Sequence, residues 1–182
     1  MSKTLVIYYS KYGTTKLYAQ WIAAELQADL LPLQRVSQRK LSSYGTIVLG
    51  SAIYGGTIKG TETLFKNQKE AAKKHLVLFT CGIADVSDPS SMEEVNTMVK
   101  EKIPPSLVSQ VPIYNFQGGI NYKKLSFVHK LMMDQLYRSV KEKNEDDLTE
   151  RDKKFLETYG KTSNHTDSEY IEDLVKYLQS LD

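Results

Sequence analysis

The chain has 182 residues, of which 41% are hydrophobic and 25% are charged, a composition typical of a globular protein with one core of ordinary size. The formal net charge of +2 hides an asymmetry, because residues 1–140 carry 17 Lys and Arg against 10 Asp and Glu, whereas residues 141–182 carry 7 against 12. The basic residues form no arginine-rich run, so we expect no binding to nucleic acid.

The first residues and the cysteine content indicate where the protein works. The start, MSKTLVIYYS, has a short apolar run that breaks into a polar turn, unlike a secretory signal. No stretch approaches the roughly 20 apolar residues that a membrane-spanning helix needs. The single cysteine, Cys81, excludes an internal disulfide and suits a reducing compartment. We therefore expect a cytoplasmic protein, with association to the cytoplasmic face of the membrane as an added option.

The N-terminal part alternates strand and helix patterns. Thr4–Tyr9 (TLVIYY) is a continuous apolar run, typical of a strand buried on both faces. Thr15–Ala28 has apolar residues at helical spacing. Asp29–Leu33 predicts a second short strand, in which Pro32 indicates an edge position. Thr46–Gly50 (TIVLG) predicts a third strand.

The alternation continues up to residue 117. Gly60–Lys74 reads as a helix with a basic exposed face, and Leu76–Cys81 (LVLFTC) as a fourth strand. Ser90–Lys102 predicts a helix that stops before Pro104-Pro105, and Val111–Gln117 a fifth strand. Strands that alternate with helices imply a doubly wound parallel sheet with right-handed crossovers and helices on both faces.

The C-terminal part departs from this rhythm. Lys124–Val140 has broad apolar coverage and predicts a helix, which a strongly charged stretch follows. Ser168–Leu181 predicts the last helix. With no internal repeat and no clear boundary, we interpret residues 1–182 as a single domain with a helix–loop insertion at about 121–165.

The insertion helix has two interpretations. It covers the sheet edge or forms a dimer face, or it acts as a lid or membrane-surface element. In the latter case apolar Phe127 and Met133 would enter the bilayer, while four cations would meet anionic headgroups. These cations are Lys123, Lys124, Lys130 and Arg138. The acidic segment directly after the helix weakens the membrane interpretation.

The first turn, Ser10–Thr15 (SKYGTT), joins a buried strand to a helix. The unpaired N–H groups at a helix start favour an anion, and Ser10, Thr14 and Thr15 add hydroxyl donors. Gly13 lets the backbone approach a ligand closely. A nucleoside-triphosphate loop (GxxxxGK[ST]) and a dinucleotide loop (GxGxxG) are both absent. The turn therefore predicts a phosphate of another kind, with a plain helix cap as the alternative.

Two more loops follow predicted strands and would lie at the same sheet edge. The second loop, Ser51–Gly56 (SAIYGG), combines flexible backbone with an aromatic side chain, against which a flat ring could lie. The third loop, Thr80–Asp85 (TCGIAD), follows the fourth strand. In open parallel sheets, ligands bind beyond the carboxyl ends of the strands at a switch point in strand order.

The motif Ser10–Thr15 and the order of elements resemble the flavodoxin family, whose fold is itself a standard example of this switch-point rule. The resemblance implies a five-stranded sheet in the order 2-1-3-4-5 and an FMN cofactor, with its phosphate in the first turn and its ring between the other loops. The cofactor-binding residues so implied are Ser10, Lys11, Tyr12, Gly13, Thr14, Thr15, Ser51, Ala52, Ile53, Tyr54, Gly55, Gly56, Thr80, Cys81, Gly82 and Ile83.

Later segments resemble the menaquinone-dependent protoporphyrinogen oxidases within this family. They are Asn115–Tyr122 (NFQGGINY), followed by an apolar helix, and Gly160-Lys161-Thr162 ahead of Thr166-Asp167. This resemblance implies an oxidoreductase with a small-molecule redox substrate and a quinone acceptor. Two features depart from it: no arginine precedes Tyr54, and the acidic Asp85 and Asp88 in and after the third loop would repel a porphyrin's carboxylates.

Single residues support less specific conclusions. Tyr54 is expected to stack on the flavin, or else to be a surface tyrosine of the loop. Cys81 is expected to be a buried small residue rather than a redox thiol. His129 is expected on the insertion helix, partly exposed, and His75 and His165 carry no partner signal. No spacing of Cys, His or Asp suggests a metal site, and no general acid or base is identified.

Three functions remain open. The first is an FMN-dependent oxidoreductase of the protoporphyrinogen-oxidase type. The second is a flavodoxin-type electron carrier, although such carriers are usually strongly acidic and would not need the insertion. The third is a non-catalytic FMN-binding module. Only the apolar face of the insertion helix favours it.

Overall fold

The computed structural model describes residues 3–181, which divide into two compact units. The first unit comprises the described residues up to Gly118 together with those from His165 onwards. The second unit is Gly119–Asn164. Its bounds lie next to the range of about 121–165 that the sequence analysis assigned to the insertion.

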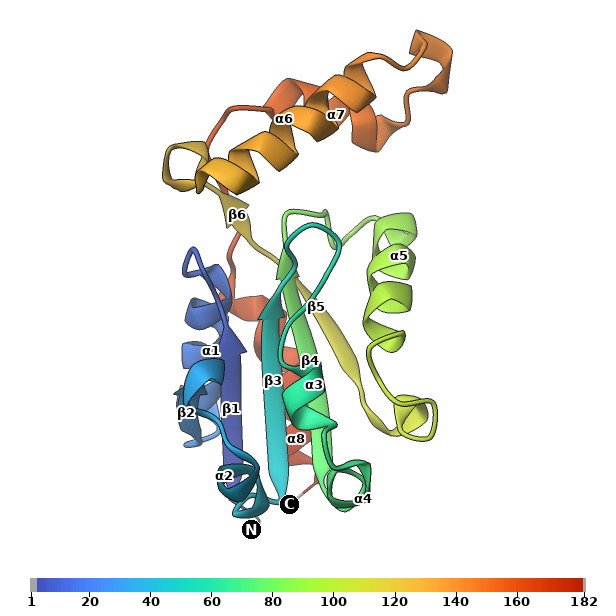
Figure 1. The fold of residues 1–182 in the computed structure, drawn as a ribbon. Helices are drawn as coiled ribbons and strands as arrows, with labels where there is room; N and C mark the ends of the chain where they lie inside the picture. The colour runs from blue at the N-terminus through green and yellow to red at the C-terminus, as the bar shows by residue number, and fades with distance from the viewer. Residues whose placement is uncertain (1–2, 182) are drawn as a thin grey trace. The chain divides into compact units, whose positions relative to one another are not determined.

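The first unit contains a five-stranded sheet in which all neighbouring strands run parallel (Figure 1). The strand order is β2-β1-β3-β4-β5, which confirms the predicted order 2-1-3-4-5. The strands are β1 (Thr4–Tyr9), β2 (Asp29–Pro32), β3 (Thr46–Ala52), β4 (His75–Gly82) and β5 (Ile113–Gln117).

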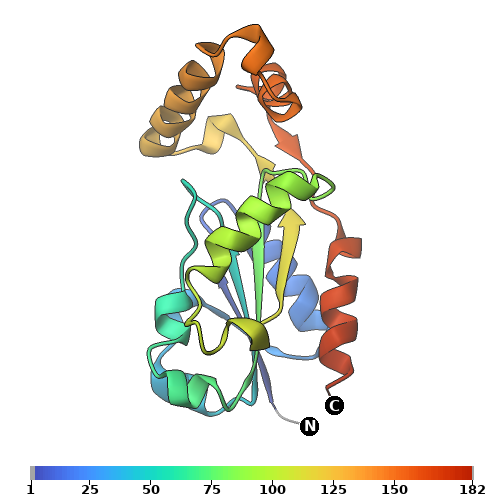
Figure 2. The same ribbon diagram turned by 90° about the vertical axis from the view of Figure 1, so that its right-hand side faces the viewer.

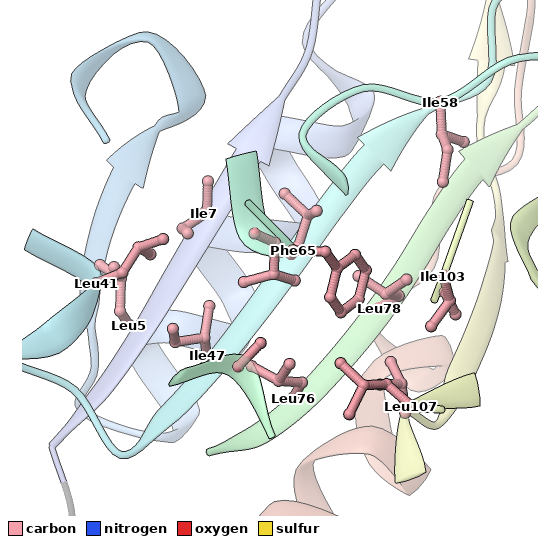
Figure 3. Packing of buried hydrophobic residues seen from close by; sticks show 14 of the residues in the cluster. Leu5, Ile7, Leu41, Ile47, Ile58, Phe65, Leu76, Leu78, Ile103 and Leu107 are labelled. Carbon is pink, nitrogen blue, oxygen red and sulfur yellow. The ribbon is translucent and has the colours of Figure 1, made fainter. Parts of the chain in front are cut away.

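The central strands are buried because successive side chains enter two different cores. Leu76 and Leu78 of β4 belong to one cluster, which Figure 3 shows from close by, whereas Val77 and Phe79 belong to the cluster on the other face. All seven residues of β3 are buried. Because a core covers both faces of these strands, apolar residues follow one another along them without alternation. Continuous apolar runs therefore predicted these strands correctly.

Helices cover both faces of this sheet, as predicted (Figure 2). One face carries α1 (Thr14–Glu25) and α8 (Glu172–Gln179), which contribute Ile22 and Leu174 to their core. The other face carries α2 (Gln38–Ser42), α3 (Thr61–Leu64), α4 (Gln68–Ala71) and α5 (Pro89–Lys100). Short 3₁₀ turns lie at Leu33–Arg35, Val108–Gln110 and Ser168–Ile171.

The single helix predicted for Gly60–Lys74 is wrong. The segment forms two four-residue helices, α3 and α4, with a break between them. Asn67 lies in the break in an extended conformation, and its side chain accepts a hydrogen bond from the backbone N–H of Glu70 at 3.3 Å. A side chain that caps a new helix start competes with continuation of the preceding helix.

The second unit is a small antiparallel strand pair that carries a helical hairpin. The strands are β6 (Gly119–Ile120) and β7 (Ser163–Asn164), and the helices are α6 (Phe127–Lys141) and α7 (Glu150–Thr158), with 3₁₀ turns at Tyr122–Lys124 and Glu145–Asp147. The rings of Tyr137 and Tyr159 stack at 4.1 Å between α6 and the end of α7. Over the residues that the structure describes, no helix is long and apolar enough to cross a bilayer.

Candidate functional site

The register of the sheet brings the three predicted loops to one edge. Ser51 is the partner of Tyr9 on one side and of Thr80 on the other. Because these strands are parallel, the first turn, the second loop and the third loop all leave the sheet at its carboxyl edge. All three belong to the first unit.

The first turn begins at Ser10 and ends in α1. Gly13 precedes the helix in the left-handed region, with φ of +102°, and a Cβ there would meet nothing within 4 Å. Its N–H donates to Ser10 Oγ at 3.1 Å. A glycine is needed here for its backbone conformation, and the Ser10 hydroxyl already serves one of the helix-start amides.

The side-chain hydroxyl of Thr15, in the first turn, is buried without a hydrogen-bond partner. The Thr15 side chain is fully buried, and its Oγ1 has no hydrogen-bond partner among the described residues. An unpaired buried hydroxyl costs about 1–3 kcal/mol, so such a group calls for a specific explanation. The Cys81 thiol lies close enough for the Thr15 hydroxyl to lower its pKa, and a helix start is also a place where an anion can bind.

A second helix start in the same unit provides a comparison. Gly60 also has φ of +102° and precedes the buried Thr61 at the start of α3. A left-handed glycine followed by a buried threonine therefore also occurs at a helix start that has no proposed ligand. These two features alone do not separate an anion site from a plain helix cap. What distinguishes the first turn is the hydroxyl oxygen of Thr15, which is completely enclosed and also lacks a hydrogen-bond partner among the described residues.

Tyr54 connects the second loop to the first turn. Its hydroxyl oxygen accepts a hydrogen bond from the backbone N–H of Lys11 at 2.9 Å. Its ring meets those of Tyr9 and Tyr12 edge-on, at centroid distances of 6.3 and 5.7 Å. Burial raises the pKa of Tyr54, and the backbone N–H groups of Lys11 and Tyr12 oppose this effect. Stacking of Tyr54 on a flavin stays a prediction.

The tip of the second loop is a tight turn. Tyr54 and Thr57 exchange two backbone hydrogen bonds of 3.1 and 3.2 Å. Between them, Gly55 and Gly56 both have positive φ, of 57° and 69°. Two consecutive left-handed residues form the turn that suits a two-residue connection, and glycine adopts it without strain. The turn presents Tyr54 at the sheet edge.

The first three residues of the second loop are buried or half-buried, and two of them make hydrogen bonds that hold the loop in place. Ser51 is buried, and its Oγ accepts the N–H of Lys59 at 2.8 Å, so its hydroxyl holds the returning chain. Ala52 is buried at the end of β3. Ile53 is half-buried, and its N–H donates to the carbonyl of Cys81 at 3.0 Å. These contacts join the second loop to the third.

The third loop contains residues in two different environments. The hydroxyl of Thr80 is buried and donates to Asn115 Oδ1 at 2.7 Å, so it is already engaged within the sheet. Cys81 is buried, as expected, and burial raises the pKa of its thiol against a smaller opposing effect of the Thr14 and Thr15 hydroxyls. Gly82 is half-buried, whereas Ile83 is 50% exposed.

The acidic residues after β4 have local roles that the sequence analysis did not anticipate. Asp88 caps α5, with its carboxylate accepting hydrogen bonds from the N–H groups of Ser90 and Ser91 at 3.2 Å. The carboxylate of Asp85 accepts from the N–H and hydroxyl of Ser87 at 3.0 and 2.6 Å. The positive end of the α5 dipole partly offsets the charge of Asp88, whereas Asp85 is bonded only to neutral groups and keeps its full negative charge.

Two residues that the predicted site lacks also lie at this edge. The N–H of Gly118 donates to the carbonyl of Gly82 at 2.7 Å, and a Cβ on Gly118 would come within 2.7 Å of Cys81 Sγ. The Tyr18 hydroxyl donates to the carbonyl of Gln117 at 2.6 Å and accepts the N–H of Asp167 at 3.2 Å. Gly118 belongs to the segment Asn115–Tyr122, on which the resemblance to the protoporphyrinogen oxidases rests. No local sequence pattern distinguishes Tyr18 from an ordinary core residue.

The three histidines have different positions in the chain. His75 begins β4, at the end of the strand opposite the third loop, and the backbone N–H of His165 donates to the carbonyl of Gly118 at 3.1 Å. His129 lies on α6 and belongs to the second unit. Within residues 3–181, no group of three or more His, Cys, Asp or Glu side chains could hold a metal ion.

Comparison with known proteins assigns the family. The model of the flavodoxin domain matches residues 5–147, and no curated protein sequence matches the chain. Similar solved structures include an archaeal flavodoxin, with 17% identity, a TM-score of 0.40 and coverage of 74% of this chain and 92% of the other.

Two bacterial structures are similar at the same level. A flavoprotein in complex with FMN from Lactobacillus acidophilus has 15% identity, a TM-score of 0.44 and coverage of 64% and 93%. An azoreductase from Bacillus anthracis has 9% identity, a TM-score of 0.46 and coverage of 64% and 87%. The matched family model spans most of the chain, includes all three loops and supports FMN as the cofactor. The chain belongs to the flavodoxin family.

Proposed function

We propose that this chain binds FMN at the three loops and works as an electron-transferring oxidoreductase. The observation that carries this proposal is Thr15, whose buried hydroxyl lacks a partner at the start of α1. A phosphate at that point would accept from the hydroxyl and from the amides of the helix start. Family membership favours FMN over other phosphate compounds.

The residues of the site fall into different roles in this proposal. Thr14, Thr15 and the backbone of the first turn would hold the phosphate. Ile53, Tyr54 and Ile83 offer the apolar surface on which a flat ring would rest, since Ile83 is half exposed. Ser51 and Thr80 would not contact the flavin through their hydroxyls, because these form hydrogen bonds within the protein that hold the loops in place. Bound FMN supplies the hydride or electron transfer, and the protein supplies binding and orientation.

We propose a quinone as the small-molecule acceptor, by resemblance to the protoporphyrinogen oxidases at residues 115–122 and 160–167. Asp88 caps α5 and Asp85 is bonded to Ser87, and both carboxylates would still repel an anionic porphyrinogen that came near them. The second candidate function is a flavodoxin-type electron carrier, which family membership favours equally.

Titration of the flavin-free protein with FMN, followed by quenching of flavin fluorescence, tests the binding site. Thr15→Ala removes a hydrogen bond to a charged group, worth about 1.5–3 kcal/mol, so FMN affinity should fall by roughly 10- to 100-fold. Thr61→Ala is the matched control, because Thr61 also follows a left-handed glycine at a helix start. Equal losses in both variants, or none in Thr15→Ala, would refute the placement of the phosphate.

A turnover assay separates the two candidate functions. The FMN-loaded protein is mixed with a porphyrinogen, or with reduced nicotinamide, and a soluble quinone. Many turnovers per flavin support the oxidoreductase, whereas a single reduction of the flavin without turnover, with rapid transfer to a redox protein, supports the carrier. A bound flavin that neither donor reduces would leave only the non-catalytic module.

A further inference from the structure

The hydroxyl of Tyr18 joins α1 to the two segments by which the chain leaves and re-enters the first unit. We call residues 117–118, where the chain leaves this unit, the exit segment, and residues 165–167, where it returns, the return segment. The Tyr18 hydroxyl donates to the carbonyl of Gln117 at 2.6 Å and accepts the N–H of Asp167 at 3.2 Å. One side chain of α1 therefore holds both segments.

Tyr18 is packed so that its hydroxyl has a fixed position. The side chain is fully buried, and its ring lies against those of Phe116 and Trp21, at centroid distances of 4.9 and 5.3 Å. Burial raises the pKa of Tyr18 above its ordinary value of 10.0, so the phenol keeps the proton that it donates to Gln117. A phenylalanine at this position would keep the ring contacts and lose only the oxygen.

The exit segment borders the first turn. Gly118 is buried, and a Cβ on it would lie 3.5 Å from Thr14 Oγ1 and 2.7 Å from Cys81 Sγ. The carbonyl of Gly118 accepts the N–H of His165 at 3.1 Å, so the exit and return segments are also bonded to each other. The segments that Tyr18 holds therefore lie directly beside a threonine that is proposed to bind the phosphate.

Tyr18 also lies on the same side of α1 as the threonines of the first turn. It follows Thr14 by four residues and Thr15 by three, and residues at these spacings are neighbours on a helix. Thr15 and Tyr18 are both fully buried. A shift of the exit segment should therefore reach the first turn by two routes, through α1 and through the contact of Gly118 with Thr14.

The loops proposed to hold the flavin ring have supports of their own. The third loop leaves β4, which is paired with β3 as far as Cys81. The second loop is closed by the tight turn between Tyr54 and Thr57, and the N–H of Ile53 donates to the carbonyl of Cys81 at 3.0 Å. None of these bonds involves the exit or the return segment. The position of the ring should thus depend on Tyr18 less than the position of the phosphate does.

We propose that Tyr18 is a positioning residue for the cofactor phosphate, an inference that rests on the proposed function. By fixing the exit and return segments, its hydroxyl sets the place of Gly118 beside Thr14 and so the shape of the phosphate site. The single proton of this hydroxyl is committed to Gln117, so Tyr18 acts through the segments that it holds and not as a donor to the phosphate. Tyr18 thereby favours FMN over riboflavin.

Titration of the flavin-free protein with FMN and with riboflavin tests the proposal. In Tyr18→Phe the affinity for FMN should fall by about 5-fold or more, the lower end of the usual coupling between two sites, while the affinity for riboflavin stays unchanged. A role in stability alone would change both affinities equally or leave both as they are. The ratio of the two affinities therefore separates a positioning role from a structural one.

Tyr44→Phe is the matched control. Tyr44 is also buried, and its hydroxyl donates to Asp29 Oδ2 at 2.6 Å. Asp29 begins β2, so this bond lies at the amino edge of the sheet, opposite the three loops. Both variants lose one buried phenol oxygen and its hydrogen bond, so both should unfold at a lower urea concentration. Only Tyr18→Phe should lose part of the preference for FMN.

Amide hydrogen exchange in the wild-type protein tests the same coupling without a substitution, and so serves even if Tyr18→Phe does not fold. Coupling between two sites is reciprocal, so saturation with FMN should slow exchange of the Asp167 N–H by about 5-fold or more. This N–H is the one that the Tyr18 hydroxyl accepts. Saturation with riboflavin, which has no phosphate, should slow its exchange less.

Three results would overturn the proposal: equal changes for FMN and riboflavin in Tyr18→Phe, the same loss of preference in Tyr44→Phe, or exchange at Asp167 that both flavins slow equally. A preference for FMN that Thr15→Ala reduces and Tyr18→Phe leaves intact refutes this inference alone. A wild-type protein that shows no preference for FMN refutes the proposed function, and this inference with it.

Discussion

The hydroxyl oxygen of Tyr54 accepts the backbone N–H of Lys11 at 2.9 Å, across 43 positions of sequence. This bond places a side chain of the second loop on an amide of the turn that is proposed to hold the phosphate. The Ser10 hydroxyl similarly accepts the N–H of Gly13. Part of the donor set of the first turn is thus engaged within the protein, and FMN has to compete for it.

Removing the Tyr54 hydroxyl should therefore help the cofactor. Tyr54→Phe keeps the ring but frees the Lys11 amide, and a net hydrogen bond of about 0.5–1.5 kcal/mol corresponds to roughly 2- to 10-fold tighter FMN binding. Tyr54→Ala should weaken binding, because the aromatic surface is lost as well. Weaker binding by Tyr54→Phe, in the same fluorescence titration, would show that the hydroxyl contributes to the bound state instead.

Two glycines with the same backbone conformation should differ in their tolerance of alanine. Gly13 and Gly60 both have φ of +102°, so each alanine carries a backbone cost of about 1–2 kcal/mol. A Cβ at Gly13 meets nothing, whereas one at Gly60 lies 2.9 Å from the buried Leu49. In urea unfolding, Gly60→Ala should lose about 1–3 kcal/mol more than Gly13→Ala, owing to overpacking. Equal losses would contradict the contact with Leu49.

Gly118 should tolerate alanine only when its nearest neighbour is reduced in size. A Cβ there would lie 2.7 Å from Cys81 Sγ and 3.2 Å from the carbonyl oxygen of Gly82. Gly118→Ala should thus lower the free energy of unfolding, and Cys81→Ala should relieve part of that loss. A double-mutant cycle measures the coupling, expected at about 0.5–3 kcal/mol for residues in contact. Strict additivity would show that the two residues do not meet.

The pKa of Tyr159 offers a test of the second unit by pH. Its hydrogen bond to Asp134 raises the pKa of Tyr159 to about 12, above the ordinary value of 10.0. A raised pKa means that the folded state prefers the neutral phenol, so this stabilisation is complete below pH 10 and is lost as the pH rises through about 12. Asp134→Asn should bring the pKa back toward 10 in an ultraviolet titration, with Tyr170→Phe as the control. An unchanged titration would exclude the bond.

The regular part of the fold could be predicted because each segment carries its own signal. The apolar runs of β1, β3 and β4 are buried on both sheet faces, so no alternation was needed to recognise them. The order of elements then restricts the topology. The boundaries failed where a polar residue ends or starts an element locally: Asn67 divides the predicted helix of 60–74 into α3 and α4.

The sequence predicted where the loops of the site lie but not which partners their side chains have. The loops follow from the carboxyl ends of parallel strands, so their position was accessible from the sequence. The side-chain partners depend on contacts that are distant in sequence, such as those of Thr80 with Asn115 and of Tyr54 with Lys11. The unpaired hydroxyl of Thr15 follows from burial in the packed fold, which no local pattern reveals.

The central claim, an FMN phosphate bound at the first turn, is tested most directly by comparing FMN with riboflavin, which has the same ring but no phosphate. We predict that the wild-type protein binds FMN at least ~10-fold more tightly than riboflavin, because hydrogen bonds to a charged group are strong. Thr15→Ala should shrink that difference while leaving riboflavin affinity unchanged. Equal affinities for the two flavins in the wild-type protein would contradict the account.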